Sequence, residues 1–270
     1  MQDLIKNIEQ YLNTGFEEKL FSASVAYLQN TSDPLRANSF CYSLRELIRH
    51  VFERRAPNDE IIKCSWFKPE TDNGLPSRRQ KYTYCVQGGL EPTFVENELK
   101  LDVLEPWKSI KGSIDTLSKY THVGKDTFDI SDIKVSAIAK EALESLLTIF
   151  HMINDTKVEL HHSLSSHIDN ELLNTFVMNS MSDIDCLSQS SYVEQSEVHE
   201  YSLSEIDYEK LLFEGNGTAY VSLNYGKKDD ACEINTDFPF KFQGHSHINK
   251  PYDLSISAED IDIDIRSWYE

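Results

Sequence analysis

The chain has 270 residues, of which 40% are apolar and 26% are charged, and its formal net charge is −19. This composition supports a sizeable hydrophobic core in two modest domains, or in one domain with a large appendage. The longest apolar stretch, residues 143–153, is far shorter than the roughly 20 apolar residues of a membrane-spanning helix, and residues 1–6 lack the features of a signal peptide, so we expect a cytoplasmic protein that does not bind a membrane.

Residues 1–56 are predicted to form three helices. Apolar residues share one helical face in residues 4–12 and again in residues 16–28. Residues 31–34 are typical of a helix start, with Pro34 in the first turn. The helix that follows ends before Pro57 and carries an apolar stripe made of Phe40, Leu44, Leu47, Val51 and Phe52.

Further helical segments follow up to residue 153. Asn58, Asp59 and Glu60 predict a helix cap or turn, and Gly88 and Gly89 close a basic and aromatic run over residues 78–84. Apolar residues at helical spacing predict helices over residues 94–107, 110–120 and 135–153. The first 155 residues are therefore predicted to be an all-helical domain.

The composition changes after residue 155. Residues 156–205 are acidic and rich in serine, which predicts a linker or a lightly packed bridge. From residue 206 onward, apolar and polar residues alternate in several short runs, and Gly215, Asn216 and Gly217 predict a turn before one of them. We therefore expect an α+β chain whose residues 206–270 form a small antiparallel sheet or sandwich.

The five cysteines exclude two classes of small protein scaffold. They are odd in number and widely spaced, and no two of them form a Cys-x-x-Cys pair. Neither a disulfide framework nor a structural zinc site is expected.

Charge is distributed unevenly along the chain. Residues 36–81 contain ten lysines and arginines against six acidic residues, whereas residues 183–209 contain eight acidic residues and no lysine or arginine. Because a phosphate-binding surface needs only a local positive potential, the net charge does not exclude nucleic-acid binding. The candidate binding residues are Arg54, Arg55, Arg78, Arg79 and Lys81. Their alternative interpretation is solvated surface charge, and the tyrosines among them are expected to pack rather than stack on bases.

Arg45 and His50 lie on the same predicted helix, with four residues between them. Histidine can transfer protons near neutral pH, and arginine can hold a phosphate and stabilise developing negative charge. At about 100° per residue the two side chains point about 140° apart, so they converge only if a partner helix or a second subunit brings them together. His50 has an alternative interpretation as a partly buried helix histidine with a local partner.

Several runs of residues resemble a known group of proteins. The runs 35–38, 44–50, 64–66, 79–82 and 87–90, and the C-terminal runs 221–226, 238–240 and 267–270, are similar to the predicted nuclease families found beside prokaryotic Argonaute/PIWI-type genes in bacterial defence loci. The spacing of Arg45 and His50 also resembles the motif of the HEPN superfamily, which are helical, metal-independent ribonucleases whose motif commonly pairs across a dimer.

The resemblance implies an endoribonuclease of anti-phage or mobile-element defence, a toxin that needs no cofactor and uses the 2′-hydroxyl of RNA as nucleophile. His50 would transfer protons and Arg45 would hold the scissile phosphate. Arg49 and His122 are further catalytic candidates, and Glu46 would orient Arg45 or His50. The implied partners are RNA rather than DNA, a second copy of the chain, and a protein from the same operon.

Two other functions stay open. A metal-dependent DNA nuclease would need clustered carboxylates, for which the candidates are Asp207 with Glu209, Asp229 with Asp230, and the alternating Asp260, Asp262 and Asp264. Histidines at 161, 162, 167, 245 and 247 are weaker candidates, and we expect no metal site. Alternatively, the acidic segments indicate a non-enzymatic interaction or sensor subunit of a defence complex.

Overall fold

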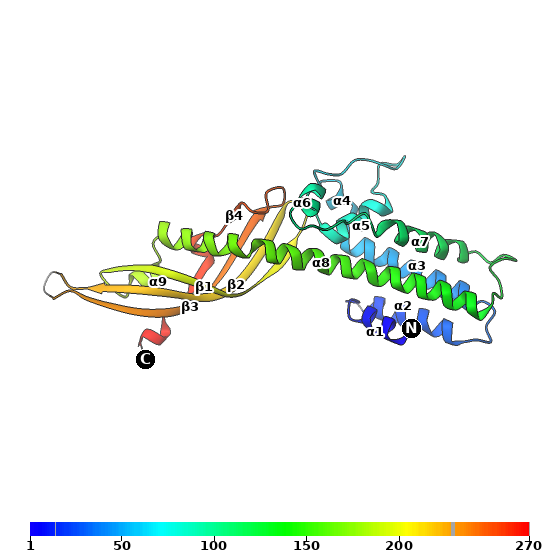
Figure 1. Ribbon diagram of the computed structural model, residues 1–270, viewed down its shortest axis with the longest axis horizontal. Coiled ribbons are helices and arrows are strands. Elements are labelled where there is room, and N and C mark those ends of the chain that lie inside the picture. The colour runs from blue at the N-terminus through cyan, green and yellow to red at the C-terminus, as the bar shows by residue number, and fades with distance from the viewer. Residues whose placement is uncertain (14, 228–229, 270) are drawn as a thin grey trace. The chain divides into compact units, whose positions relative to one another are not determined.

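The computed structural model describes residues 1–13, 15–227 and 230–269, and it confirms an α+β chain (Figure 1). Two compact units are present, one made of residues 1–88 and 92–156 and the other of residues 89–91 and 157–270. The helices are α1 (Gln2–Glu9), α2 (Gly15–Gln29), α3 (Arg36–Arg55), α4 (Asn58–Ile61), α5 (Arg78–Gln87), α6 (Pro92–Asn97), α7 (Trp107–Tyr120), α8 (Asp132–Met178) and α9 (Ser182–Asp185). The strands are β1 (Ser190–Ile206), β2 (Lys210–Tyr225), β3 (Cys232–His247), β4 (Leu254–Ser255) and β5 (Ile261–Ile263).

Helix α3 lies at the centre of the first unit. It packs against α2, α5 and α7. Its predicted apolar stripe is confirmed, because Phe40, Leu44, Leu47, Val51 and Phe52 are all buried. The helix begins at Arg36, two residues after Pro34, and Asp33 Oδ1 accepts a hydrogen bond from the amide of Leu35 just before it. The N-terminal half of α8 packs on α7 through a hydrogen bond between the hydroxyls of Ser113 and Ser145, 2.7 Å apart.

The basic and aromatic run forms helix α5. Ser77 and Gln80 make a capping box at its start, and Gly88 ends it with a φ of 59°, a left-handed conformation that favours glycine. Tyr82 and Tyr84 are buried, Tyr82 against the ring of Trp107. These tyrosines pack in the core, so stacking on nucleic-acid bases is excluded for them in this structure.

The predicted helix over residues 94–107 was wrong in its extent. Helix α6 ends at Asn97, and Lys100 follows with a φ of 58°. The amides of Leu104 and Glu105 then donate to Asp102 Oδ1 in a side-chain turn. Because Pro106 disfavours a helical conformation in the residue before it, the next helix begins only at Trp107.

The predicted linker over residues 156–205 was also wrong, since this segment is largely regular structure. Helix α8 continues to Met178 and β1 begins at Ser190. The second half of α8 buries one residue in every four, namely Leu160, Leu164, Ile168, Leu172 and Phe176. Their stripe covers one face of the sheet, where the rings of Phe176 and Phe240 lie 5.4 Å apart.

The sheet has the order β1-β2-β3-β4, with β5 also pairing with β3, and all its pairs are antiparallel. Its three main strands have 16 or 17 residues, longer than the short runs that the sequence predicted. The turn predicted at residues 215–217 was wrong. Gly215 lies opposite Phe242 and Gly217 opposite Phe240 within the paired strands, where each phenylalanine ring covers a glycine.

Cys41, Cys64 and Cys85 are buried, Cys186 and Cys232 are exposed, and all five are free thiols. None of the helices in the described part of the chain has the length and apolar character needed to span a bilayer.

Candidate nucleic-acid interface and active site

Four cationic side chains surround one small cavity in the first unit. Arg45 and Arg49 come from α3, one turn apart, and Arg78 and Lys81 come from the first turn of α5. The cavity has a volume of about 140 Å³ and no acidic residue among those that line it, which are Arg45, Ile48, Arg49, Phe52, Pro76, Arg78, Lys81 and Ile114. The sequence placed these four cations in two separate groups, and the structure brings them together.

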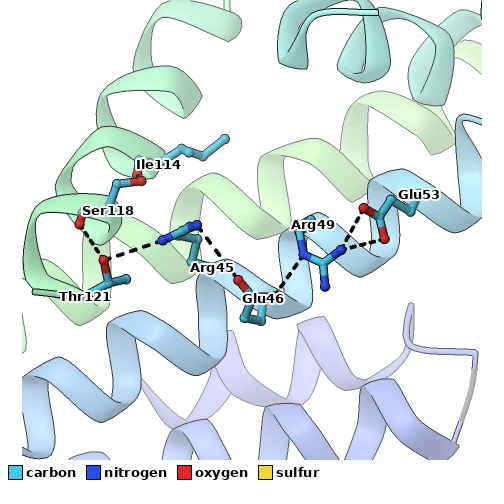
Figure 2. Close-up of polar contacts among 7 residues, drawn as sticks. All are labelled: Arg45, Glu46, Arg49, Glu53, Ile114, Ser118 and Thr121. Atoms are coloured by element: carbon cyan, nitrogen blue, oxygen red, sulfur yellow. Dashed lines mark hydrogen bonds and ion pairs between the residues drawn. The ribbon is translucent and has the colours of Figure 1, made fainter. Parts of the chain in front are cut away.

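Arg45 is held against the C-terminal end of α7 (Figure 2). Its Nη1 donates to Thr121 Oγ1 at 3.4 Å, and the hydroxyl of Thr121 in turn donates to the carbonyl of Ser118 at 2.7 Å. A cation is favoured at this end of a helix, where the carbonyl groups are not all paired. Arg45 also lies 3.9 Å from Glu46, a distance that leaves most of its hydrogen-bonding capacity available.

Arg49 is bound by two carboxylates of its own helix (Figure 2). Its Nε donates to Glu46 at 2.9 Å, and its Nη1 donates to both oxygens of Glu53 at 2.7 and 2.8 Å. Hydrogen bonds to Glu46 and Glu53 raise the pKa of this guanidinium. Arg49 therefore contributes less free charge to the cavity than its neighbours.

Arg78 and Lys81 have no ion pair or hydrogen-bond partner for their side chains among the described residues. Arg78 is exposed and Lys81 is half-buried. Four cations against the two carboxylates of Glu46 and Glu53 leave a local excess of positive charge. This part of the chain can thus attract a phosphate even though the molecule as a whole is acidic.

His50 lies in a second cluster, on the side of α3 that faces α2. Its Nδ1 lies 3.2 Å from Glu17 Oε1, and Arg54 donates to both oxygens of the same carboxylate at 2.8 and 3.1 Å. The side chain of Glu17 is completely buried, whereas that of His50 is 35% exposed. The ring of His50 also contacts Phe16, with centroids 4.8 Å apart.

The Glu17 carboxylate fixes the state of this cluster. Burial alone would raise the pKa of Glu17, but hydrogen bonds from Arg54, the Asn13 amide and His50, with the charge of Arg54, outweigh burial and lower it. An ionised carboxylate only accepts hydrogen bonds, so Nδ1 of His50 carries the proton in this contact. The Nε2 atom of the neutral ring is then the nitrogen that can accept a proton.

Arg45 and His50 consequently face different helices within one chain. Arg45 contacts α7 and His50 contacts α2, in keeping with the 140° that helical periodicity puts between them. A single copy of the chain does not pair these two side chains with each other.

The other candidate residues have separate surroundings. Arg54 is engaged by Glu17, and Arg79 forms an ion pair with Glu70. Arg55 is half-buried, its Nε atom has no hydrogen-bond partner, and burial followed by the charge of Arg54 lowers its pKa. His122 is exposed just beyond α7, where its carbonyl accepts a hydrogen bond from Thr127.

Glu17, Thr121 and the apolar residues Ile48, Phe52 and Ile114 of the cavity were not predicted from the sequence as parts of a site. The sequence does contain a signal for Glu17. Its spacing from Phe21 and Ser24 puts it on the same face of α2, and this face is buried. A carboxylate at a core position needs a cationic partner, which Arg54 supplies. No comparable signal marks Thr121, whose role depends on how α3 and α7 pack.

Among the described residues, no three His, Cys, Asp or Glu side chains form a group that could hold a metal ion. Asp207 instead accepts hydrogen bonds from the amides of Glu209 and Lys210 in the turn before β2, and Asp229 lies outside the described residues. Hydrogen bonds from the side chain and the backbone amide of Arg266 lower the pKa of Asp264 to about 2.

The candidate histidines of the second unit have other contacts. His161 stacks on Tyr201 with ring centroids 4.0 Å apart, and His167 stacks on Tyr252 at 4.3 Å. His245 and His247 are exposed on one face of β3.

Comparison with known proteins gives two matches. Two family models, each described as a predicted pPIWI-associating nuclease, match residues 9–146 and residues 153–269. The first covers just over half of the chain and includes all the residues of both clusters. No curated protein and no solved structure matches the chain.

Proposed function

Because the chain belongs to the family of predicted pPIWI-associating nucleases, we propose that it is a metal-independent endoribonuclease acting in anti-phage or mobile-element defence. The observation that carries the proposal is the cavity where Arg45, Arg49, Arg78 and Lys81 converge. Guanidinium and ammonium groups on one surface supply the charge that binding a phosphodiester requires.

In the proposed reaction, Arg45, Arg78 and Lys81 hold the scissile phosphate. The 2′-oxygen attacks the phosphorus, and the bond to the 5′-oxygen breaks. One proton leaves the 2′-hydroxyl and one reaches the departing 5′-oxygen, so that a 2′,3′-cyclic phosphate and a 5′-hydroxyl are formed. His50 is the proton-transfer group, with its Nδ1 held by Glu17 and its Nε2 directed to the substrate.

The opposed directions of Arg45 and His50 support a site made by two copies of the chain. In such a homodimer, the cation cavity of one copy would face His50 of the other. His122 is the second candidate for proton transfer. Arg49 is a weaker candidate for phosphate binding than the other three cations, since Glu46 and Glu53 already bind it.

The test is cleavage of RNA by the wild-type chain and two variants in the presence of EDTA. We expect Arg45→Ala and His50→Ala each to lower the cleavage rate by about 10²-fold or more, because each removes a group that acts on the transition state. Lys140→Ala is the control, since it removes an exposed cation of α8. Circular dichroism and thermal unfolding establish that the variants fold.

Each other outcome identifies a different function. Loss of wild-type cleavage in EDTA indicates metal-dependent chemistry and contradicts the proposed mechanism. Absence of cleavage of any nucleic acid, together with a tight protein partner, indicates an interaction subunit. The outer face of the sheet favours this second candidate function, an interaction subunit, because it carries an acidic group made of Glu200, Glu214 and Asp262 around Lys241.

A further inference from the structure

We propose that the cavity between α3, α5 and α7 receives one unpaired pyrimidine base, whose adjoining phosphate is held by Arg78 and Lys81. The substrate is then single-stranded at the bound nucleotide. This inference rests on the proposed function, because it assigns a substrate class to the same cation cluster.

The cavity has an apolar floor. Ile48, Phe52 and Ile114 line the cavity beneath the cations and are only 4% to 5% exposed. A site for phosphate alone needs no such floor, whereas a base buries a flat apolar surface when it leaves the stack. The cations at the rim are complementary to the phosphate of a nucleotide, and the apolar side chains are complementary to its base.

The size of the cavity suits one base. The volume of about 140 Å³ is close to the roughly 150 Å³ of an engineered cavity that holds one benzene molecule. It therefore has room for a single six-membered ring. Within a duplex, bases are paired and stacked, so a base can enter the cavity only by flipping out of the stack, which costs a few kcal/mol.

The charges of Arg78 and Lys81 are available to a phosphate. Arg78 is exposed, and neither Arg78 nor Lys81 has a side-chain partner among the described residues. Both come from the first turn of α5, on either side of Arg79 and Gln80. Together with Arg45 and Arg49 they are the charged side chains that line the cavity in the described part of the chain. A phosphate attached to the bound base meets these cations without first displacing a carboxylate.

The experiment measures binding to the His50→Ala chain, which is not expected to cleave its ligand. A labelled single-stranded oligouridylate is the probe, with uridine 5′-monophosphate and ribose 5-phosphate as competitors that differ only in the base. We expect uridine 5′-monophosphate to compete about tenfold better, and the probe annealed to its complement to bind at least about tenfold more weakly. Equal competition by the two phosphates, or equal binding of the duplex, would overturn the inference.

Single substitutions distinguish the contribution of the apolar floor to binding from that of the cations at the rim. Arg78→Gln should weaken both competitors alike and lower the salt dependence of oligouridylate binding by about 0.7 in the slope of log K against log salt. Phe52→Leu should weaken only uridine 5′-monophosphate. Lys140→Gln, a matched loss of one exposed charge, should change the binding of neither competitor. If Phe52→Leu fails to fold, the comparison of the two competitors on the His50→Ala chain still tests the base site.

Failure of this inference is distinguishable from failure of the proposed function. If ribose 5-phosphate competes as well as uridine 5′-monophosphate while the wild-type chain still cleaves RNA, the base site is wrong and the nuclease stands. If the wild-type chain cleaves no RNA, the proposed function is wrong whatever the competitors show.

Discussion

At the scale of single residues, Glu17 has the most consequential position, because one buried carboxylate holds both His50 and Arg54. We expect Glu17→Gln to lower the free energy of unfolding by about 2 kcal/mol, because hydrogen bonds to charged groups usually contribute about 1.5–3 kcal/mol. Urea denaturation measures the change. Glu53→Gln is the control, since its exposed ion pair with Arg49 is screened by solvent and should contribute much less to the free energy of unfolding.

The same residue predicts a dependence of stability on pH. The pKa of Glu17 is lower in the folded chain than its ordinary value of 4.5, so its contribution is fully present above that value and is lost as the pH falls through the folded pKa. The difference in unfolding free energy between the wild type and Glu17→Gln should therefore shrink progressively below about pH 4.5. A difference that stays constant from pH 6 to pH 3 would contradict this assignment.

The sequence could predict which residue types form the candidate site, but not how they are grouped. The cationic excess of residues 36–81 is visible in the sequence, and so is the angle between Arg45 and His50. The partners of each cation are not, because they depend on tertiary packing: Arg79 meets Glu70 whereas Arg78, its neighbour, faces the cavity. Whether a charge is free or neutralised follows only from those contacts.

At the scale of elements, the glycines of β2 are expected to be intolerant of a side chain. A Cβ atom on Gly217 would lie 2.3 Å from the carbonyl oxygen of Glu197 and 2.7 Å from the ring of Phe240. Gly217→Ala should therefore destabilise the second unit by about 1–3 kcal/mol, as overpacking of a core does. Thermal unfolding followed by circular dichroism measures the effect.

Gly112 provides the contrasting case. A Cβ atom at this position of α7 meets nothing within 4 Å. Gly112→Ala should stabilise the chain by about 0.5–1 kcal/mol, because alanine loses less conformational freedom than glycine in a helix. Equal effects of the alanine substitutions at Gly112 and Gly217 would contradict the Gly–Phe packing described for the sheet.

Element prediction succeeded where local signals agreed and failed where composition concealed a pattern. Helix α3 has a start signal, a regular apolar stripe and a following proline, and it was predicted nearly to its ends. The second half of α8 has an equally regular stripe, but its serines, acids and histidines suggested a linker. Gly215 and Gly217 suggested a turn because the phenylalanines that require them are more than 20 residues away in the sequence.

At the scale of the whole molecule, the opposed directions of Arg45 and His50 predict complementation between two inactive chains. In a dimer that joins Arg45 of one copy to His50 of the other, a heterodimer of Arg45→Ala and His50→Ala retains one intact site. An equal, randomly exchanged mixture should therefore recover about a quarter of the wild-type cleavage rate. If the mixture stays inactive although native mass spectrometry shows mixed dimers, the shared site is wrong.

The burial of the thiols determines where the native chain can be labelled. Cys41, Cys64 and Cys85 are buried in the helical unit, and burial raises the pKa of Cys41 and Cys85 to about 12, so neither presents a thiolate at neutral pH. Cys186 and Cys232, in the second unit, are exposed. A maleimide dye should accordingly attach to the sheet-bearing unit while the cation cavity keeps its native chemistry, and Cys186→Ser would leave one exposed thiol as a single attachment point for fluorescence studies.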